Sequence, residues 1–212
     1  RIIGKSQQLL RVDYENNEHV HKNIEASIMG FLEKNINYAD VVVISDYAKG
    51  VVTQEISKKI LEISKKHNKP VIVDPKPKHK DFYSDATLIT PNNSEASEMA
   101  GIEDGSDERI GEIGKKLMKS LNTNVLITRG EKGMSLFEKD SKVIHIPAKA
   151  KEVYSLIGAG DTVVATIAMA IASGSDLREA AVLSNIAAGI KVGKIGTASV
   201  SIEEIKNGIE GL

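Results

Sequence analysis

The stretch YSLIGAGDTVVATIAMAIASG, residues 154–174, decides how this sequence folds. Gly158, Ala159 and Gly160 have little or no side chain, a carboxylate follows at Asp161, and then comes a long run of small apolar residues. The run predicts a buried helix over residues 161–173. The first turn of a helix has free N–H groups and a partial positive charge, and phosphate oxygens bind there when no Cβ blocks their approach. The stretch therefore predicts an anion-binding loop at the start of a buried helix.

The carboxylate of Asp161 indicates what such a loop could do. A carboxylate repels a bound phosphate, so its place beside an anion site makes sense for a base that takes a proton from an attacking hydroxyl. The loop lacks the Lys-Ser/Thr ending of a Walker A loop and the G-x-G-x-x-G fingerprint of dinucleotide sites. On this motif alone a plain alternative stays open, a glycine turn in which Asp161 only caps the helix.

Composition narrows the classes of function. The chain has 212 residues, a hydrophobic content of 41%, a formal net charge of −1 and no cysteine. This suits one large domain, argues against nucleic-acid or membrane partners, and excludes disulfides and thiolate metal sites. No apolar run reaches membrane-spanning length and no signal peptide is recognisable, so we expect a cytoplasmic protein. Because the chain opens with Arg1, we expect the natural start to lie upstream.

Short β-branched runs alternate with helical patterns along the chain. Four of these runs are nearly continuous in apolar residues, as strands covered on both faces must be. They are residues 40–46, 69–75, 86–92 and 124–130. Residues 133–147 instead predict an antiparallel hairpin that turns near residues 139–141.

Helices are predicted between and after these strands. Apolar stripes at helical spacing run through residues 20–32, 56–63 and 110–121. Thr53 is a candidate N-cap, and the pairs Asp176 with Glu179 and Ser201 with Glu204 have the spacing of capping boxes. The alternation of strand and helix predicts an α/β fold with a mostly parallel central sheet and flanking helices.

Polar side chains close several of the apolar runs. They are Asp46, Asp74, Asn92 and Arg129. Ligands of open α/β sheets bind beyond the carboxyl ends of the strands. We therefore expect the functional residues at that edge of the sheet.

Further segments carry a resemblance to a known family. They are NNSE (92–95), TRGEKG (128–133), SNIAAG (184–189) and GKIGT (193–197). Together with GAGD (158–161) they resemble the ribokinase-like (PfkB) carbohydrate kinases over most of the chain from about Val41 onward. The resemblance implies a ribokinase-like fold whose N-terminal strands and β lid are absent from this chain.

The resemblance also implies roles for these residues. Gly158, Ala159 and Gly160 would form an anion hole, and Asp161 would be the catalytic base. ATP and magnesium would be the cofactors, with the ion held through water by Asn92 and Glu95. The implied cofactor-binding residues are Asn92, Asn93, Ser94, Glu95, Thr128, Gly130, Gly133, Asn185, Gly189 and Gly196.

Two of these motifs have ordinary structural explanations as well. One neutral and one charged oxygen at Asn92 and Glu95 suit hydrated magnesium, but the same spacing suits an N-cap with its capping-box glutamate. Thr128, Gly130 and Gly133 suit a nucleotide turn, and equally a plain turn from strand to hairpin.

Three more segments indicate a substrate. They are QQLLRVDYE (7–15), SDYAKG (45–50) and VDPK (73–76). They look most like segments of the family members that phosphorylate D-glycero-D-manno-heptose 7-phosphate at C1 in lipopolysaccharide synthesis. Lys49, Asp74 and Lys76 would then contact sugar or phosphate, although solvated surface is the usual place for a lysine.

Other functions stay open beside the heptose kinase. Another sugar kinase of the family, of fructose or ribose type, is the nearest alternative. A non-catalytic nucleotide-binding remnant is a second alternative from a different class. A Rossmann-type dehydrogenase is disfavoured because the dinucleotide fingerprint is absent.

The sequence departs from the family in two places. Family members are longer at the N-terminus, where they hold the first strands, much of the sugar pocket and a lid that often forms the dimer interface. Residues 1–212 would be about the C-terminal two-thirds of a kinase domain, with a homodimer expected for the full-length protein. Ser155 and Ile157 stand where the family usually has Asp and Thr, which help to hold a monovalent cation near the anion hole. A monovalent cation as cofactor is therefore doubtful.

Overall fold

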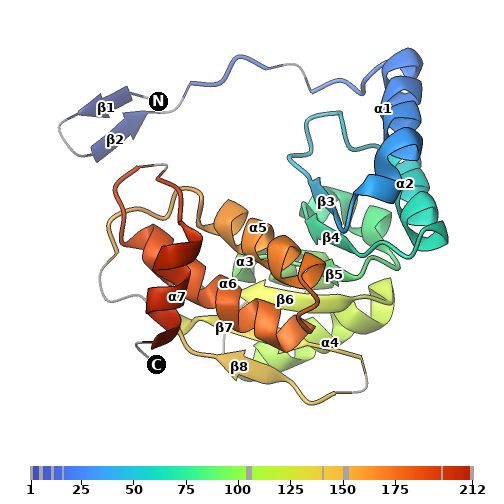
Figure 1. Ribbon diagram of the computed structural model, residues 1–212. Helices are drawn as coiled ribbons and strands as arrows, with labels where there is room; N and C mark the ends of the chain where they lie inside the picture. The colour runs from blue at the N-terminus through green and yellow to red at the C-terminus, as the bar shows by residue number, and fades with distance from the viewer. Residues whose placement is uncertain are drawn as a thin grey trace.

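The computed structural model describes residues 2–4, 7–10, 12–15, 17–103, 107–139, 141–149, 153–196 and 198–210. Within them, helices cover both faces of a six-stranded sheet (Figure 1). The strands, in their order across the sheet, are β3 (Val42–Ser45), β4 (Val71–Asp74), β5 (Leu88–Ile89), β6 (Asn124–Thr128), β7 (Met134–Phe137) and β8 (Ile144–Ile146). The first four are parallel to one another, and β7 and β8 form the predicted antiparallel hairpin. The predicted α/β class is confirmed.

Seven α-helices and three short 3₁₀ helices complete the described residues. They are α1 (Lys22–Asn35), η1 (Ile36–Tyr38), α2 (Gln54–Lys66), η2 (Pro77–Tyr83), α3 (Asn93–Ala100), α4 (Asp107–Leu121), η3 (Gly130–Lys132), α5 (Ala159–Ala172), α6 (Leu177–Val192) and α7 (Ile202–Glu210). Thr53 caps α2 by accepting the Ile56 amide at 3.2 Å. The capping boxes predicted for α6 and α7 form with both of their hydrogen bonds.

Successive strand residues feed two cores on opposite faces of the sheet. Val71 and Val73 pack into the core that α3 and α4 cover, whereas Ile72 between them packs into the core that α5 and α6 cover. Side chains of a strand alternate between faces, so a strand covered on both sides must be apolar throughout. This is why the four runs lack alternation. β5 is shorter than predicted; Thr90 after it still donates its amide to the Val73 carbonyl at 2.9 Å, and Pro91 beyond has no N–H to donate.

Three differences from the expectations concern the ends and the surface. β1 (Ile2–Gly4) and β2 (Gln7–Leu10) form a separate antiparallel pair, which no pattern predicted, at the end of an extended segment (Figure 1). Met169 lies in the apolar run from which the sequence predicts a buried helix, but it is 59% exposed, because α5 packs through the opposite side of the helix, around Ile167. Helix α5 also begins at Ala159, two residues before its predicted start.

Parts of some predicted segments lie outside the described residues. They are Arg11 of QQLLRVDYE, Asp140 in the predicted hairpin turn, and Thr197 of GKIGT. Among the helices that the structure does describe, none is long and apolar enough to cross a membrane.

Candidate active site

Polar residues from several strands meet at the carboxyl edge of the sheet, as predicted. The Asp46 amide, just after β3, donates a 3.0 Å hydrogen bond to the carbonyl of Asp74 at the end of β4. Asn92, after β5, pairs with Thr128 at the end of β6 through a single parallel bridge. The carboxylate of Asp161 at the start of α5 is close enough to act on the charge of Asp74. The sheet and α5 thus bring these residues to one place.

The loop of residues 158–160 leads into α5 with free amide groups. Gly158 is the N-cap residue and has a φ of 79°, a left-handed conformation that glycine adopts without strain. Within the described residues, the amides of Gly158 and Gly160 have no acceptor, whereas the Ala159 amide donates to the Leu156 carbonyl at 3.2 Å. Two of the three predicted amide donors are therefore available to an anion.

Asp161 lies at the mouth of this loop. Its side chain is exposed, and α5 has no side-chain hydrogen bond at its N-cap. Asp161 lies in the first turn of α5, where a carboxylate also suits the positive end of the helix, so the alternative in which it only supports the helix start stays open. A Cβ added at Gly158 would stand 3.9 Å from Oδ2 of Asp161, so the carboxylate borders the space that the missing side chain leaves open.

Asp46 holds the SDYAKG segment against η2. Its Oδ2 accepts the Tyr83 hydroxyl at 2.6 Å and lies 2.7 Å from Nδ1 of His79, while Oδ1 accepts the Ala48 amide at 2.7 Å. Burial, together with the hydrogen bond to Asp46, raises the pKa of Tyr83, so the phenol keeps its proton. A buried carboxylate with three partners is a structural anchor beneath the site.

Asp74, Lys76 and Glu95 form a charged cluster beside that anchor. Burial raises the pKa of Asp74 to about 6; the Lys76 charge opposes this rise, and the negative charges of Glu95 and Asp161 add to it. The Lys76 ammonium pairs with the Glu95 carboxylate. Burial disfavours the charged form of Lys76, but the hydrogen bond to Glu95 and the nearby carboxylates outweigh it and raise the pKa. The Lys76 ammonium is thus held in place by Glu95. The alternative in which Lys76 is a freely solvated surface lysine is wrong.

Asn92 and Glu95 form the capping box of α3. Asn92 Oδ1 accepts the Glu95 amide at 2.9 Å, and Glu95 Oε2 accepts the Asn92 amide at 3.0 Å. The ordinary explanation of this motif is therefore confirmed. Each oxygen of a carboxylate has two lone pairs, so Glu95 can still accept hydrogen bonds from water. Asn93 and Ser94 lie between them in the first turn of α3.

The two glycines of TRGEKG differ in what surrounds them. Gly133 has a φ of 81°, and a Cβ there would lie 2.0 Å from the Ile146 carbonyl oxygen, so the hairpin itself requires this glycine. Gly130 has a φ of 58° with open space where a Cβ would stand. Thr128 is half-buried at the end of β6. The predicted turn from strand to hairpin is present. Gly130 has open space where a side chain would stand, and Thr128 is partly exposed, so a ligand could approach this part of the turn.

The residues expected in the adenine pocket lie on α6 and after it. The Asn185 side chain is buried and donates to the Pro147 carbonyl at 2.7 Å, while Gly189 is half-buried on the same helix. Gly196 has a φ of 70°, and its carbonyl accepts the Lys191 ammonium at 2.8 Å.

Lys49 of SDYAKG is held by the extended segment that precedes α1. Its ammonium pairs with the carboxylate of Glu15. The neighbouring Gly50 carbonyl accepts the Val20 amide at 3.0 Å. Lys49 is therefore an ion-paired residue rather than a freely solvated one.

Three residues near the site were missed at the sequence level. Tyr83 and His79 follow β4 in a segment with no periodic pattern, so nothing in the sequence indicated that they meet Asp46. Lys191 did leave a signal. It lies four residues after Ala187 and seven after Ser184, and this spacing puts it on the buried face of α6.

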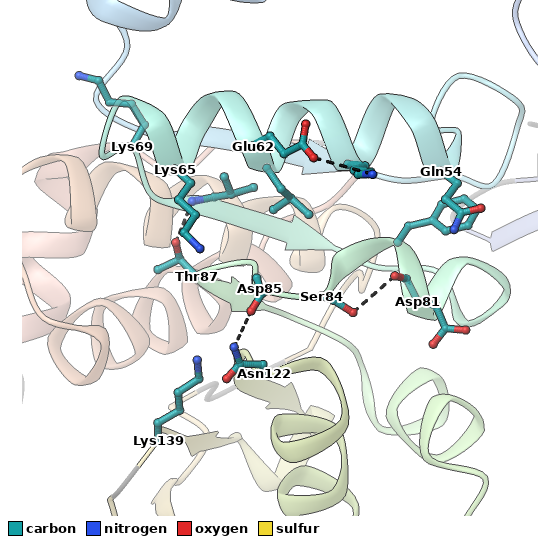
Figure 2. A pocket seen from close by; sticks show the side chains of 14 residues that line it. Gln54, Glu62, Lys65, Lys69, Asp81, Ser84, Asp85, Thr87, Asn122 and Lys139 are labelled. Carbon is teal, nitrogen blue, oxygen red and sulfur yellow. Dashed lines mark hydrogen bonds and ion pairs between the residues drawn. The ribbon is translucent and has the colours of Figure 1, made fainter.

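A groove of about 620 Å³ lies at the opposite edge of the sheet (Figure 2). It is lined by α2 and by residues just before or at the start of strands, including Val71, Thr87 and Asn122. Asp85 and Asn122 join across it by a hydrogen bond. None of the residues predicted to bind substrate or nucleotide lines this groove, so it is not the candidate site. Within the described part of the chain, no three acidic, His or Cys side chains cluster closely enough to hold a metal ion.

Comparisons with known proteins bear on the family and the fold of this chain. The profile of the pfkB family carbohydrate kinase matches residues 2–205. The bifunctional protein HldE of Geobacter metallireducens is 40% identical over 206 residues, which are 97% of this chain and 42% of that protein. HldE of Histophilus somni is 42% identical over 212 residues, 100% of this chain and 44% of that protein. The chain thus spans less than half the length of these relatives.

Solved structures share the fold. Phosphofructokinase-2 from Escherichia coli, in complex with potassium, superposes with a TM-score of 0.77 at 17% identity and covers 89% of this chain and 62% of its own. Ribokinase from Arabidopsis thaliana, complexed with ribose and ATP, gives 0.73 at 22% identity, over 92% of this chain and 61% of its own. The expected ribokinase-like fold is confirmed, and the chain belongs to the pfkB family of carbohydrate kinases.

Proposed function

We propose that this chain carries the nucleotide-binding and catalytic part of an ATP-dependent sugar kinase. The observation that carries this proposal is the exposed Asp161 carboxylate beside two amides, those of Gly158 and Gly160, that have no acceptor among the described residues. The favoured reaction is phosphorylation of heptose 7-phosphate at C1 to heptose 1,7-bisphosphate, in ADP-heptose and lipopolysaccharide core synthesis in the cytoplasm. Its support is the identity of about 40% to bifunctional HldE proteins.

The residues of the site suit this chemistry. Asp161 would take the proton of the sugar hydroxyl while the hydroxyl oxygen bonds to the γ-phosphorus of ATP and the bond to the leaving ADP oxygen breaks. The amides of Gly158 and Gly160 would donate to the oxygens of the transferring phosphoryl group. The Ala159 amide would join them on leaving the Leu156 carbonyl. Asp74 and Lys76 would bind the sugar or its phosphate at the ends of the strands.

Magnesium fits the carboxylates at this edge. The ion prefers oxygen ligands, keeps several of its waters and is usually held by one or two carboxylates together with substrate phosphates. Burial raises the pKa of Asp74, the Lys76 charge opposes this rise, and the negative charges of Glu95 and Asp161 add to it. Asn92 and Glu95 would hold the ion through water. When bound, it would offset the charge of the ATP phosphates.

The residues before the anion-binding loop do not suit a monovalent cation. The neighbour phosphofructokinase-2 was solved with potassium. In this chain Ser155 and Ile157 offer no carboxylate, and the Ser155 hydroxyl already accepts the Ile157 amide at 3.3 Å. The proposed reaction therefore includes no such ion. A homodimer of the full-length protein remains part of the proposal, and one neighbouring structure is a tetrameric form of phosphofructokinase-2.

The experiment that tests this function is an ADP-release assay on the natural full-length protein. It compares heptose 7-phosphate, fructose 6-phosphate and no sugar, each with ATP and magnesium. Release with heptose 7-phosphate alone supports the proposal. Release with fructose 6-phosphate alone would favour another sugar kinase, and ATP binding without release under any condition would favour a nucleotide-binding remnant.

A further inference from the structure

Lys191 is the most deeply buried lysine for which the structure gives an exposure. It projects from the last turn of α6, and only 2% of the residue is exposed. Lysine is almost never buried to this degree unless its charge is paired. A buried ammonium without an opposite charge is costly, because it loses its hydration without gaining a counter-charge.

The ammonium of Lys191 has no carboxylate partner among the described residues. Its hydrogen bond there goes to the Gly196 carbonyl at 2.8 Å, and an ammonium group has three hydrogens to donate. The other lysines near the site differ, since Lys76 pairs with Glu95 and Lys49 pairs with Glu15. Lys191 is thus a buried lysine that forms no ion pair within the described residues.

Lys191 lies next to Gly158 of the anion-binding loop. A Cβ added at Gly158 would stand 3.5 Å from Cε of Lys191 and 3.9 Å from Oδ2 of Asp161. Cε of Lys191 and the Asp161 carboxylate therefore both lie close to the position that a Cβ of residue 158 would take. The chain before the loop is fixed to the same end of α6, because the amides of Tyr154 and Ser155 both donate to the Val192 carbonyl, at 2.7 and 3.1 Å.

We propose that Lys191 is a built-in cation that supports phosphate binding at Gly158 and Gly160, in place of a monovalent metal ion. The inference rests on the proposed nucleotide site and deepens it. The buried ammonium lies beside Gly158 and favours an anion at the loop, and in a water-poor environment such a charge acts more strongly than in solvent. A bound metal cation next to it would be repelled. Lys191 acts on the nucleotide through the loop, so it is a positioning residue and not a catalytic one.

The test measures ATP affinity by calorimetry, with magnesium present, on the natural full-length protein. Wild type is compared in potassium chloride and in choline chloride of the same ionic strength. Lys191→Met removes the charge and keeps the length of the side chain, and Lys191→Ala leaves room for added ethylammonium chloride. Lys206→Met, an exposed lysine of α7, is the matched control. Thermal melting of each variant reports whether the fold survives.

The proposal expects the same wild-type affinity for ATP in both salts. Lys191→Met should bind ATP about tenfold more weakly or worse, and ethylammonium should restore part of the affinity of Lys191→Ala, which a purely structural lysine would not show. Lys206→Met should bind like wild type. Two results would overturn the inference and leave the kinase standing: a wild-type affinity that depends on potassium, or a Lys191→Met variant that binds ATP as wild type does. A wild type that binds no ATP in either salt would instead contradict the proposed nucleotide site, and the inference with it.

Discussion

The Tyr83 hydroxyl donates a 2.6 Å hydrogen bond to Oδ2 of Asp46 and accepts a 3.0 Å hydrogen bond from the Lys76 amide. One phenol thus joins the residue after β3 to the chain just after β4. Because Lys76 in turn pairs with Glu95, this link fixes where three charged side chains of the candidate site stand.

Replacing Tyr83 by Phe should therefore destabilise the fold. The variant keeps the buried ring but leaves the Lys76 amide without its acceptor and takes one donor from the buried Asp46 carboxylate. The free energy of unfolding should fall by about 1 to 3 kcal/mol. Urea unfolding followed by circular dichroism measures this loss. Tyr38→Phe is the matched control, since Tyr38 is 87% exposed, and equal stability of the two variants would contradict the anchoring role.

The raised pKa of Asp74 predicts a pH dependence of stability. The folded pKa of about 6 lies above the ordinary value of about 3.9 in an unfolded chain. Between these values the folded state binds more protons than the unfolded state, so this group lowers the free energy of unfolding as the pH rises from about 4 to 6. Asp74 costs stability in full only above pH 6.

Asp74→Asn should remove that cost. Allowing for partial exposure of the side chain, we expect a gain of about 1 to 2 kcal/mol at pH 7.5 relative to wild type, and a much smaller gain near pH 4. Urea unfolding at the two pH values measures the difference. Asp81→Asn, at an exposed position of η2, should show no such change between the two conditions. A gain of the same size at both pH values would mean that the pKa of Asp74 is not raised.

Two capping boxes allow the magnesium role of Glu95 to be separated from its structural role. Glu95 in α3 and Glu179 in α6 make the same pair of hydrogen bonds with Asn92 and Asp176. Only Glu95 also pairs with a lysine of the candidate site. Substituting each glutamate by glutamine removes one charge from one capping box.

Glu95→Gln should raise the magnesium concentration needed for half-maximal ADP release, because one of the two proposed groups that hold the hydrated ion loses its charge. We expect a shift of about tenfold, similar to the loss when an outer ligand of a metal site is removed. Glu179→Gln should lower stability slightly through its capping box, and it should leave the magnesium requirement unchanged. Equal magnesium curves for the two variants would reduce Asn92 and Glu95 to a helix cap.

The fold could be predicted where the signal is local. The apolar runs that contain Val71, Ile72 and Val73 specified strands, and residue pairs three apart, such as Asp176 with Glu179, specified helix starts. Both signals depend on neighbours in the sequence, whose relation is fixed by the period of a strand or a helix. The GAGD loop was likewise a local pattern, although its helix begins two residues earlier than predicted.

The supports of the site could not be predicted in the same way. Asp46 meets Tyr83 across 37 residues and His79 across 33, and no periodic pattern links positions so far apart. Lys191 could be placed on the buried face of its helix, but its closeness to Gly158 depends on how α6 packs against α5. The pairing of Lys76 with Glu95 likewise requires that β4 and α3 be placed side by side.

The role of Asp161 makes the most direct prediction about the reaction. Asp161→Asn keeps the shape of the side chain and removes its ability to accept a proton at neutral pH. If Asp161 is the base, turnover of the full-length protein should fall by about a hundredfold to ten-thousandfold. ATP affinity should hold or improve, because the carboxylate that repels phosphate is gone. ADP release gives the first quantity and calorimetry the second. Survival of more than about one tenth of the wild-type turnover would show that another group takes the proton, whereas loss of ATP binding would show that Asp161 supports the loop and not the chemistry.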